Sequence, residues 1–149
     1  MFLLDTNIIS EARKGNRANP GVIAFRAQIL NEEDFLPVQV IGELRYGVEV
    51  LKHRGDLLQA AVVEEWLEVI LVEYAKRILP FNAEAALIWG QLMSPHGHNP
   101  VDKQMAAIAL LYDLTLVTRN VDDFAGTGVR LLNPWSEPEN PSDAAPPEA

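Results

Sequence analysis

The sequence has no cysteine among its 149 residues, which excludes disulfide bonds and thiolate metal sites. It also lacks a run of about 18 uninterrupted apolar residues, the length that a membrane-spanning helix needs. No basic region precedes the apolar start Met1–Leu4, and Asp5 interrupts that start, so we expect no secretory signal. Together these absences predict a cytoplasmic protein with no membrane association.

Basic residues are scarce, with 12 Lys and Arg against 21 Asp and Glu and a net charge of −9. This balance argues against a broad basic groove for nucleic acid. Much of the excess lies at the end of the chain, where four acids and no base follow Trp135, leaving 17 acids against 12 bases before it. RNA is therefore not excluded as a ligand, because several of the remaining acids can face a cation.

The length and composition suit a single domain with a proper core, since 48% of the residues are hydrophobic and 22% are charged. Residues 136–149 differ, being rich in proline, acid and small side chains. Such a segment cannot bury enough apolar surface to offset its ordering entropy. We therefore expect a domain over residues 1–135 and a disordered tail over 136–149.

Within the domain, strand-like and helix-like segments alternate, which predicts an α/β fold with a parallel sheet covered on both faces. Asn19-Pro20 and Asn82 are expected to begin helices, because Asn is a favoured cap and Pro suits the first helical position. Expected strands cover residues 1–4, 35–38, 78–79, 114–117 and 129–132; expected helices cover 8–12, 20–30, 41–51, 57–72, 83–92 and 101–111.

Two acids stand where an α/β sheet binds ligands. Asp5 ends the first strand, and ligands in such sheets lie beyond the carboxyl ends of strands. Asp102 opens a nearly apolar helix, where an acid also complements the helix dipole. A helix that apolar must lie on the sheet, so its first carboxylate is expected to share the crevice with Asp5.

Glu43 is a third candidate. It lies about 200° around its helix from Ile41, away from the apolar stripe, where an ordinary solvated acid is the alternative. Gly42 beside it costs about 1 kcal/mol relative to Ala in a helix, which suggests that something passes close to the backbone there.

A fourth acid follows the strand 114–117 and is either Asp122 or Asp123. One or both can simply cap the turn around Phe124, a role better suited to Asp122. Thr118 and Asn120 supply neutral oxygens at the same strand end.

Clustered carboxylates repel by about 4 kcal/mol for each close pair at an effective dielectric of 20. No Lys or Arg is placed in the sequence to neutralise all of them, so a hard divalent cation is the simplest solution. Oxygen ligands select Mg²⁺ or Mn²⁺, and Mg²⁺ usually lies beside phosphate. The pattern therefore favours metal-dependent phosphodiester hydrolysis.

The chain resembles the PIN-domain ribonucleases and, more narrowly, the VapC toxins of bacterial toxin–antitoxin pairs. The resemblance covers Met1 to Trp135 and is carried by the segments 3–11 (LLDTNIISE), 42–47 (GELRYG), 77–81 (RILPF), 102–109 (DKQMAAIA), 116–124 (LVTRNVDDF), 127–129 (TGV) and 132–135 (LNPW).

The resemblance implies a PIN-like α/β/α sandwich around a mostly parallel sheet. It also implies an endoribonuclease that depends on Mg²⁺, with Mn²⁺ as a substitute, and that cleaves RNA, often tRNA. Family members form homodimers and are silenced by a cognate antitoxin protein.

By position, the resemblance makes Asp5 and Asp102 the main metal ligands and Glu43 the third catalytic acid. The fourth is assigned to Asp123, although some relatives carry an acid at the position of Asn120. Thr6 matches a hydroxyl residue near the metal, which otherwise simply caps a helix.

Three basic residues stand beside the proposed acids: Arg45, Lys103 and Arg119. Each arginine either forms a structural ion pair or contacts phosphate, and the sequence does not separate these roles. Lys103 replaces a commonly small residue and is a further candidate for phosphate.

Two other functions are alternatives. A receiver-like domain would accept phosphate on a strand-end Asp, but it needs two acids after the first strand and another on a middle strand. An inactive PIN module that only binds protein is the second alternative.

Overall fold

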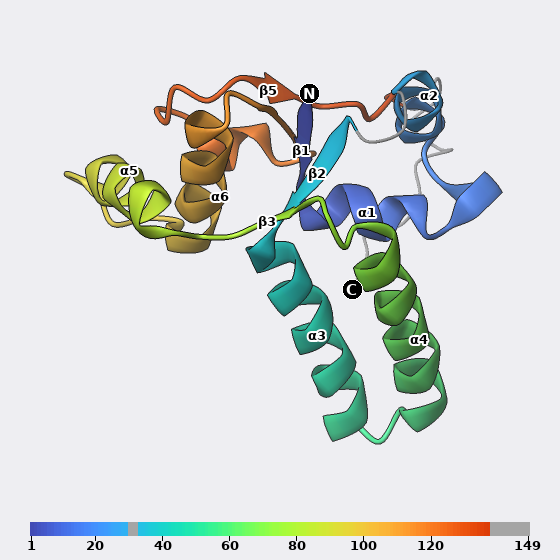
Figure 1. Ribbon diagram of the computed structural model, residues 1–149. Coiled ribbons are helices and arrows are strands. Elements are labelled where there is room, and N and C mark those ends of the chain that lie inside the picture. The colour runs from blue at the N-terminus through green and yellow to red at the C-terminus, as the bar shows by residue number, and fades with distance from the viewer. Residues whose placement is uncertain (30–32, 138–149) are drawn as a thin grey trace.

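Five short parallel strands form the centre of the computed structural model, which describes residues 1–29 and 33–137 (Figure 1). The strand order is β3-β2-β1-β4-β5, so the first strand is central. The predicted α/β class is confirmed, and the sheet is entirely parallel where a mostly parallel one was expected. The strands are β1 (Phe2–Leu4), β2 (Asp34–Pro37), β3 (Ile78–Leu79), β4 (Thr115–Val117) and β5 (Leu131–Leu132).

The helices lie on both sides of these strands. Figure 1 shows α5 and α6 together on one side and α1 and α2 on the other, while α3 and α4 form a hairpin that extends away from the sheet. None of the described helices has the length and apolar content to cross a membrane. Their bounds are α1 (Thr6–Ala12), α2 (Pro20–Gln28), α3 (Val38–His53), α4 (Leu57–Glu73), α5 (Ala83–Met93) and α6 (Pro100–Leu111), with 3-10 turns at Gly15–Arg17 and Val121–Phe124.

The core explains why these segments take these structures. Leu3, Leu4, Leu116 and Val117 of the two central strands are fully buried, as expected for strands covered on both faces. The α6 segment 105–109 is also fully buried, so this helix packs directly on the sheet. Its first turn, with Asp102, is thereby held in a fixed position relative to the strands.

The predicted helix caps are confirmed. The Asn19 side chain accepts a hydrogen bond of 2.9 Å from the N–H of Gly21, with Pro20 at the first position of α2. Asn82 accepts a bond of the same length from Ala85 at the start of α5. Both caps satisfy N–H groups that the first helical turn leaves without a backbone partner.

Three predicted boundaries were wrong. Val38 begins α3 instead of ending β2, because the extended Pro37 closes the strand and stands as the N-cap of the helix. The second helix ends at Gln28 and Ile29 is already extended, while Leu30 lies outside the described residues. The last strand covers only Leu131–Leu132.

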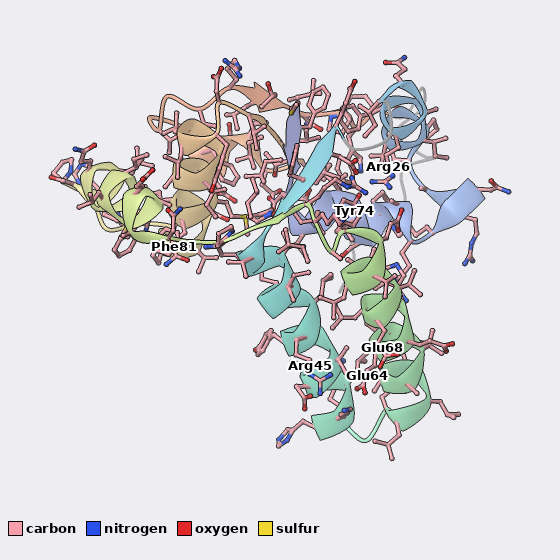
Figure 2. The ribbon with its side chains drawn as sticks, in the orientation of Figure 1. Arg26, Arg45, Glu64, Glu68, Tyr74 and Phe81 are labelled. Carbon is pink, nitrogen blue, oxygen red and sulfur yellow. The ribbon has the colours of Figure 1, made fainter. Side chains whose placement is uncertain are left out.

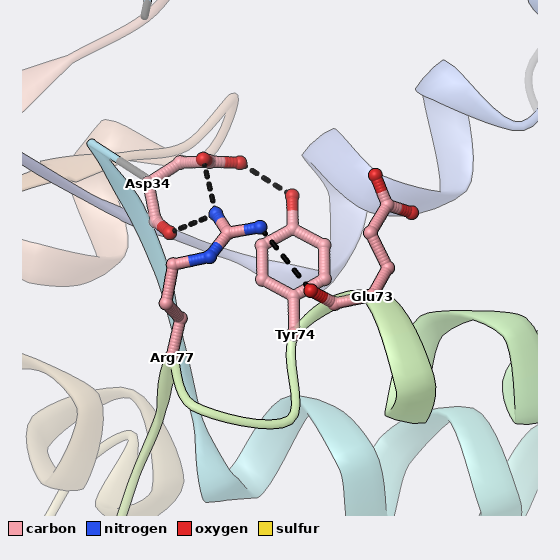
Figure 3. Close-up of polar contacts among 4 residues, drawn as sticks. All are labelled: Asp34, Glu73, Tyr74 and Arg77. Carbon is pink, nitrogen blue, oxygen red and sulfur yellow. Dashed lines mark hydrogen bonds and ion pairs between the residues drawn. The ribbon is translucent and has the colours of Figure 1, made fainter. Parts of the chain in front are cut away.

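A buried polar network lies where β2 begins (Figure 3). The Tyr74 hydroxyl donates to Oδ2 of Asp34, and Nη1 of Arg77 donates to Oδ1 of the same carboxylate at 2.6 Å. Burial is the main reason that the pKa of Tyr74 rises to about 12, and the hydrogen bond to Asp34 raises it further. The tyrosine therefore stays neutral, and the network joins the end of α4 to the amino edge of the sheet.

The segment after β5 returns to α2. Asn19 bonds both backbone groups of Ser136, each at 3.0 Å. A Cβ on Gly21 would lie 2.1 Å from the carbonyl oxygen of Pro134, so only glycine permits this approach. Ser136, the first residue of the predicted tail, is thus hydrogen-bonded to the domain. Disorder beyond it stays a prediction, because residues 138–149 lie outside the described part of the chain.

Candidate functional site

Asp5 lies at the carboxyl end of the central strand and is 6% exposed. Its Oδ1 accepts a hydrogen bond of 2.7 Å from the N–H of Thr6 and so caps α1. Its Oδ2 accepts one of 2.8 Å from the hydroxyl of Thr118, the residue after β4. Burial raises the pKa of Asp5; these two bonds partly oppose the rise, and the charge of Asp123 adds to it.

Glu43 is an exposed residue of α3 and lies outside its buried stripe of Val40, Leu44 and Val48, as the sequence predicted. Its Oε2 accepts a hydrogen bond of 2.8 Å from the hydroxyl of Thr6. Desolvation raises the pKa of Glu43; the bond from Thr6 opposes this and the charge of Asp5 adds to it. Thr6 therefore touches the acids of both β1 and α3, one through its N–H and the other through its hydroxyl.

Asp102 lies in the first turn of α6, and burial and the charges of the other three acids affect its pKa. Burial is the largest cause that raises its pKa from 3.8 to about 6, followed by the charges of Asp5, Asp123 and Glu43. Of the two neighbouring acids in the turn after β4, Asp123 is the one whose charge acts on Asp102. These four acids, far apart in the sequence, interact electrostatically at one edge of the sheet.

Asn7 is a site residue that the sequence analysis did not single out. Its Nδ2 donates to Oδ2 of Asp5 at 3.4 Å and to the hydroxyl of Thr118 at 3.3 Å, and its Oδ1 accepts from the N–H of Arg119 at 3.3 Å. Asn120 contributes to the site through its backbone N–H, which donates to the hydroxyl of Thr118 at 3.0 Å. The only sequence signal for Asn7 is its place in the first helical turn after Asp5.

A second missed feature is a pair of amides. Nε2 of Gln39, one helical turn before Glu43, donates to Oε1 of Gln104, next to the Asp102 turn, at 3.2 Å. It is the one hydrogen bond between α3 and α6 among the described residues. The side-chain oxygen of Gln39, Oε1, is buried and has no hydrogen-bond partner within the described part of the chain. The pair bridges the two helices that carry Glu43 and Asp102.

No described part of the chain accounts for Gly42, so a close approach by another molecule stays a prediction. A Cβ built on this glycine would meet no atom within 4 Å, so no described segment passes close to it. The backbone beside Glu43 is open surface.

The donor chemistry fits a hard divalent cation. In the described chain, none of the four acids forms an ion pair with Lys or Arg. No group of three or more His, Cys, Asp or Glu side chains in residues 1–29 and 33–137 is already arranged to hold a metal. Mg²⁺ needs only one or two carboxylates because it keeps several waters. Asp5 and Asp102, whose pKa values are raised first by burial and further by neighbouring carboxylates, are the residues that would hold such an ion.

The structure combines a parallel sheet with acids at the carboxyl ends of its strands. Comparison with known families identifies the class: the chain belongs to the PIN-domain family, whose model matches residues 2–129. Toxin FitB of Neisseria gonorrhoeae is 36% identical over 92% of this chain and its own full length. The VapC ribonuclease Y4jK of Sinorhizobium fredii is 28% identical over 91% of this chain and 98% of its own.

Solved structures agree with this assignment. The crystal structure of FitAcB from Neisseria gonorrhoeae matches with a TM-score of 0.80 at 36% identity, covering 91% of this chain and 99% of the other. FitAB bound to an IR36 DNA fragment matches with a TM-score of 0.77 at 33% identity, covering 93% and 99%. The expected PIN-like fold is thereby confirmed.

Proposed function

We propose that this chain is the ribonuclease toxin of a toxin–antitoxin pair and hydrolyses RNA phosphodiester bonds with the help of Mg²⁺ or Mn²⁺. Membership of the PIN family and similarity to FitB and the ribonuclease Y4jK support the class. The observation that carries the chemistry is Asp102, whose pKa is raised to about 6 by burial and then by the charges of Asp5, Asp123 and Glu43. A bound divalent cation would offset the repulsion among these carboxylates and keep them ionised.

In this proposal Asp5 and Asp102 hold the metal, with Glu43 and Asp123 completing the catalytic acids. When bound, such a cation offsets negative charge on the phosphate and activates a water molecule. Thr118 keeps Oδ2 of Asp5 in one orientation.

Thr6 aligns Glu43 with Asp5 through its two hydrogen bonds. Asn120 supports the site by bonding Thr118.

The proposed partners follow from the relatives. We infer RNA, with tRNA as the expected substrate, a cognate antitoxin, and a second copy of the chain in the cytoplasm. FitAcB and FitAB were solved as complexes. Apolar side chains that stand 72% to 87% exposed on α3, α4 and α5 are suitable for protein contact: Tyr46, Leu58, Val72 and Leu87.

The receiver-like alternative has no support. A receiver sheet has the order 2-1-3-4-5, whereas β3 is an edge strand here. β2 ends at Pro37 without an acid.

The test is cleavage of bulk tRNA by the purified protein, with Mg²⁺, with Mn²⁺ and with EDTA. Asp5→Asn and Asp102→Asn should abolish cleavage while leaving the fold intact by circular dichroism. Glu68→Gln on α4 is the matched control, because it removes one carboxylate from the far hairpin (Figure 2). Full activity of both site variants would contradict the role given to Asp5 and Asp102, whereas a wild type that cleaves no RNA with either metal would support the inactive-module alternative.

A further inference from the structure

An acidic protein with four acids at its site must still attract RNA, which is itself a polyanion. The net charge of −9 offers no long-range attraction. Local cations beside the acids must therefore supply it. Three basic residues are adjacent to the site in the sequence, and the structure separates their roles.

Two of the three already have partners. Arg45 pairs with Glu49 at 2.6 Å and with Glu64 at 3.4 Å, so its charge is used between α3 and α4. Figure 2 shows Arg45 and Glu64 facing each other inside the hairpin. Lys103 donates from Nζ to the carbonyl oxygen of His96 at 2.8 Å. This bond ties the ammonium to the loop before α6.

Arg119 is different. Its side chain is exposed and, within the described residues, has no ion pair or side-chain hydrogen bond. The guanidinium carbon lies 5.3 Å from the ring centroid of Trp135, which is itself half-buried against the core. A cation held over an indole face keeps its full charge and its hydrogen-bond donors free.

The position of Arg119 is set by the site itself. Its backbone N–H donates to Asn7, and the preceding Thr118 donates to Asp5. Arg119 therefore directly follows Thr118, the residue whose hydroxyl contacts the buried Asp5. Trp135 is fixed in turn by the bonds of Ser136 to Asn19.

We propose that Arg119, supported by Trp135, binds a backbone phosphate of the RNA at the rim of the acidic site. This inference rests on the proposed nuclease function and adds the residue that holds the substrate. The contact is to phosphate, which every RNA carries, so it supplies affinity and register and no sequence preference.

The test measures binding without cleavage. Fluorescein-labelled bulk tRNA is titrated with the Asp5→Asn protein by anisotropy at several KCl concentrations. Adding Arg119→Ala should weaken binding several-fold at low salt and reduce the slope of log affinity against log salt by about 1. Arg119→Lys should restore the slope, because it restores the charge. Arg45→Ala is the matched control and should leave both quantities unchanged.

Trp135→Phe gives a second variant, which should weaken binding less than Arg119→Ala because a smaller ring still supports the guanidinium. If Arg119→Ala binds tRNA with the affinity and salt slope of its parent, this inference is wrong and the nuclease proposal stands. If the Asp5→Asn parent binds no tRNA and the wild type cleaves none, both are overturned together.

Discussion

The hydroxyl of Thr118 donates a 2.8 Å hydrogen bond to Oδ2 of Asp5, joining the residue after β4 to the residue after β1. The same hydroxyl accepts bonds from Asn7 and from the backbone of Asn120. Because Thr118 is fully buried, no solvent competes for these bonds. Thr118 thus gives Oδ2 of the central acid its shortest hydrogen bond, beside the longer one from Asn7.

Thr118→Val should impair the site without unfolding the protein. It keeps the shape of the side chain but removes a hydrogen bond to a charged group, which contributes about 1.5–3 kcal/mol. We expect Mn²⁺ affinity, measured by calorimetry, to fall about 10–100-fold. Thr118→Ser retains the hydroxyl and should bind nearly as the wild type does. Equal losses in the two variants would mean that the methyl group matters and the hydrogen bond does not.

The raised pKa of Asp102 makes metal-free stability depend on pH. The unfolded chain loses this proton near pH 3.8 and the folded chain near pH 6, so the folded state binds more protons between them. Its contribution to stability therefore falls as the pH rises through that interval. In EDTA, Asp102→Asn should melt above the wild type at pH 7 and converge with it near pH 4.

Mg²⁺ should reverse this difference at pH 7, because it binds and stabilises only the folded wild type with its acid ionised. Thermal unfolding with and without Mg²⁺ checks both statements. A constant offset between wild type and Asp102→Asn across the pH range would contradict the assignment of the raised pKa.

The Gln39–Gln104 pair should tune metal binding. Each of α3 and α6 packs mainly on another helix, α4 and α5 respectively, so this bond helps to set the spacing of Glu43 and Asp102. Gln39→Ala and Gln104→Ala should each raise the Mn²⁺ concentration for half-maximal binding about tenfold. The double variant should be no worse than either single one, because both remove the same bond. Additive losses would show that the two amides act separately.

Two glycines should respond in opposite ways to alanine. Gly21→Ala forces a Cβ against the carbonyl oxygen of Pro134 and should lower the free energy of unfolding by about 1–3 kcal/mol. Gly42→Ala meets no atom within 4 Å and should raise it by about 0.5–1 kcal/mol, as an alanine does in a helix interior. Urea denaturation measures both. A stabilised Gly21→Ala would mean that the segment after β5 does not lie on α2.

The backbone elements near the site follow from local sequence rules. Asn82 caps a helix, and the apolar run that ends at Asp5 forms a strand, because each depends on neighbours along the chain. The position of Pro37 was harder to predict, since proline suits both a strand end and a helix start.

Contacts between distant segments lay beyond such rules. The bond between Gln39 and Gln104 depends on how two helices pack, and the three hydrogen bonds of Asn7 depend on the approach of β4. Likewise, Glu49 follows Arg45 by one helical turn in the sequence, but only the α3–α4 hairpin brings Glu64 to the same guanidinium.

The strand order has a consequence for how the protein is made. β1 precedes both of its neighbours, β2 and β4, in the chain, and the hydroxyl that orients Asp5 follows that acid by 113 residues. A nascent chain interrupted before Thr115 contains Asp5 and β2 but neither β4 nor the hydroxyl of Thr118. We therefore expect such fragments from stalled ribosomes to be inert, so that a cell is exposed to the full chemistry only after β4 and Thr118 have been made.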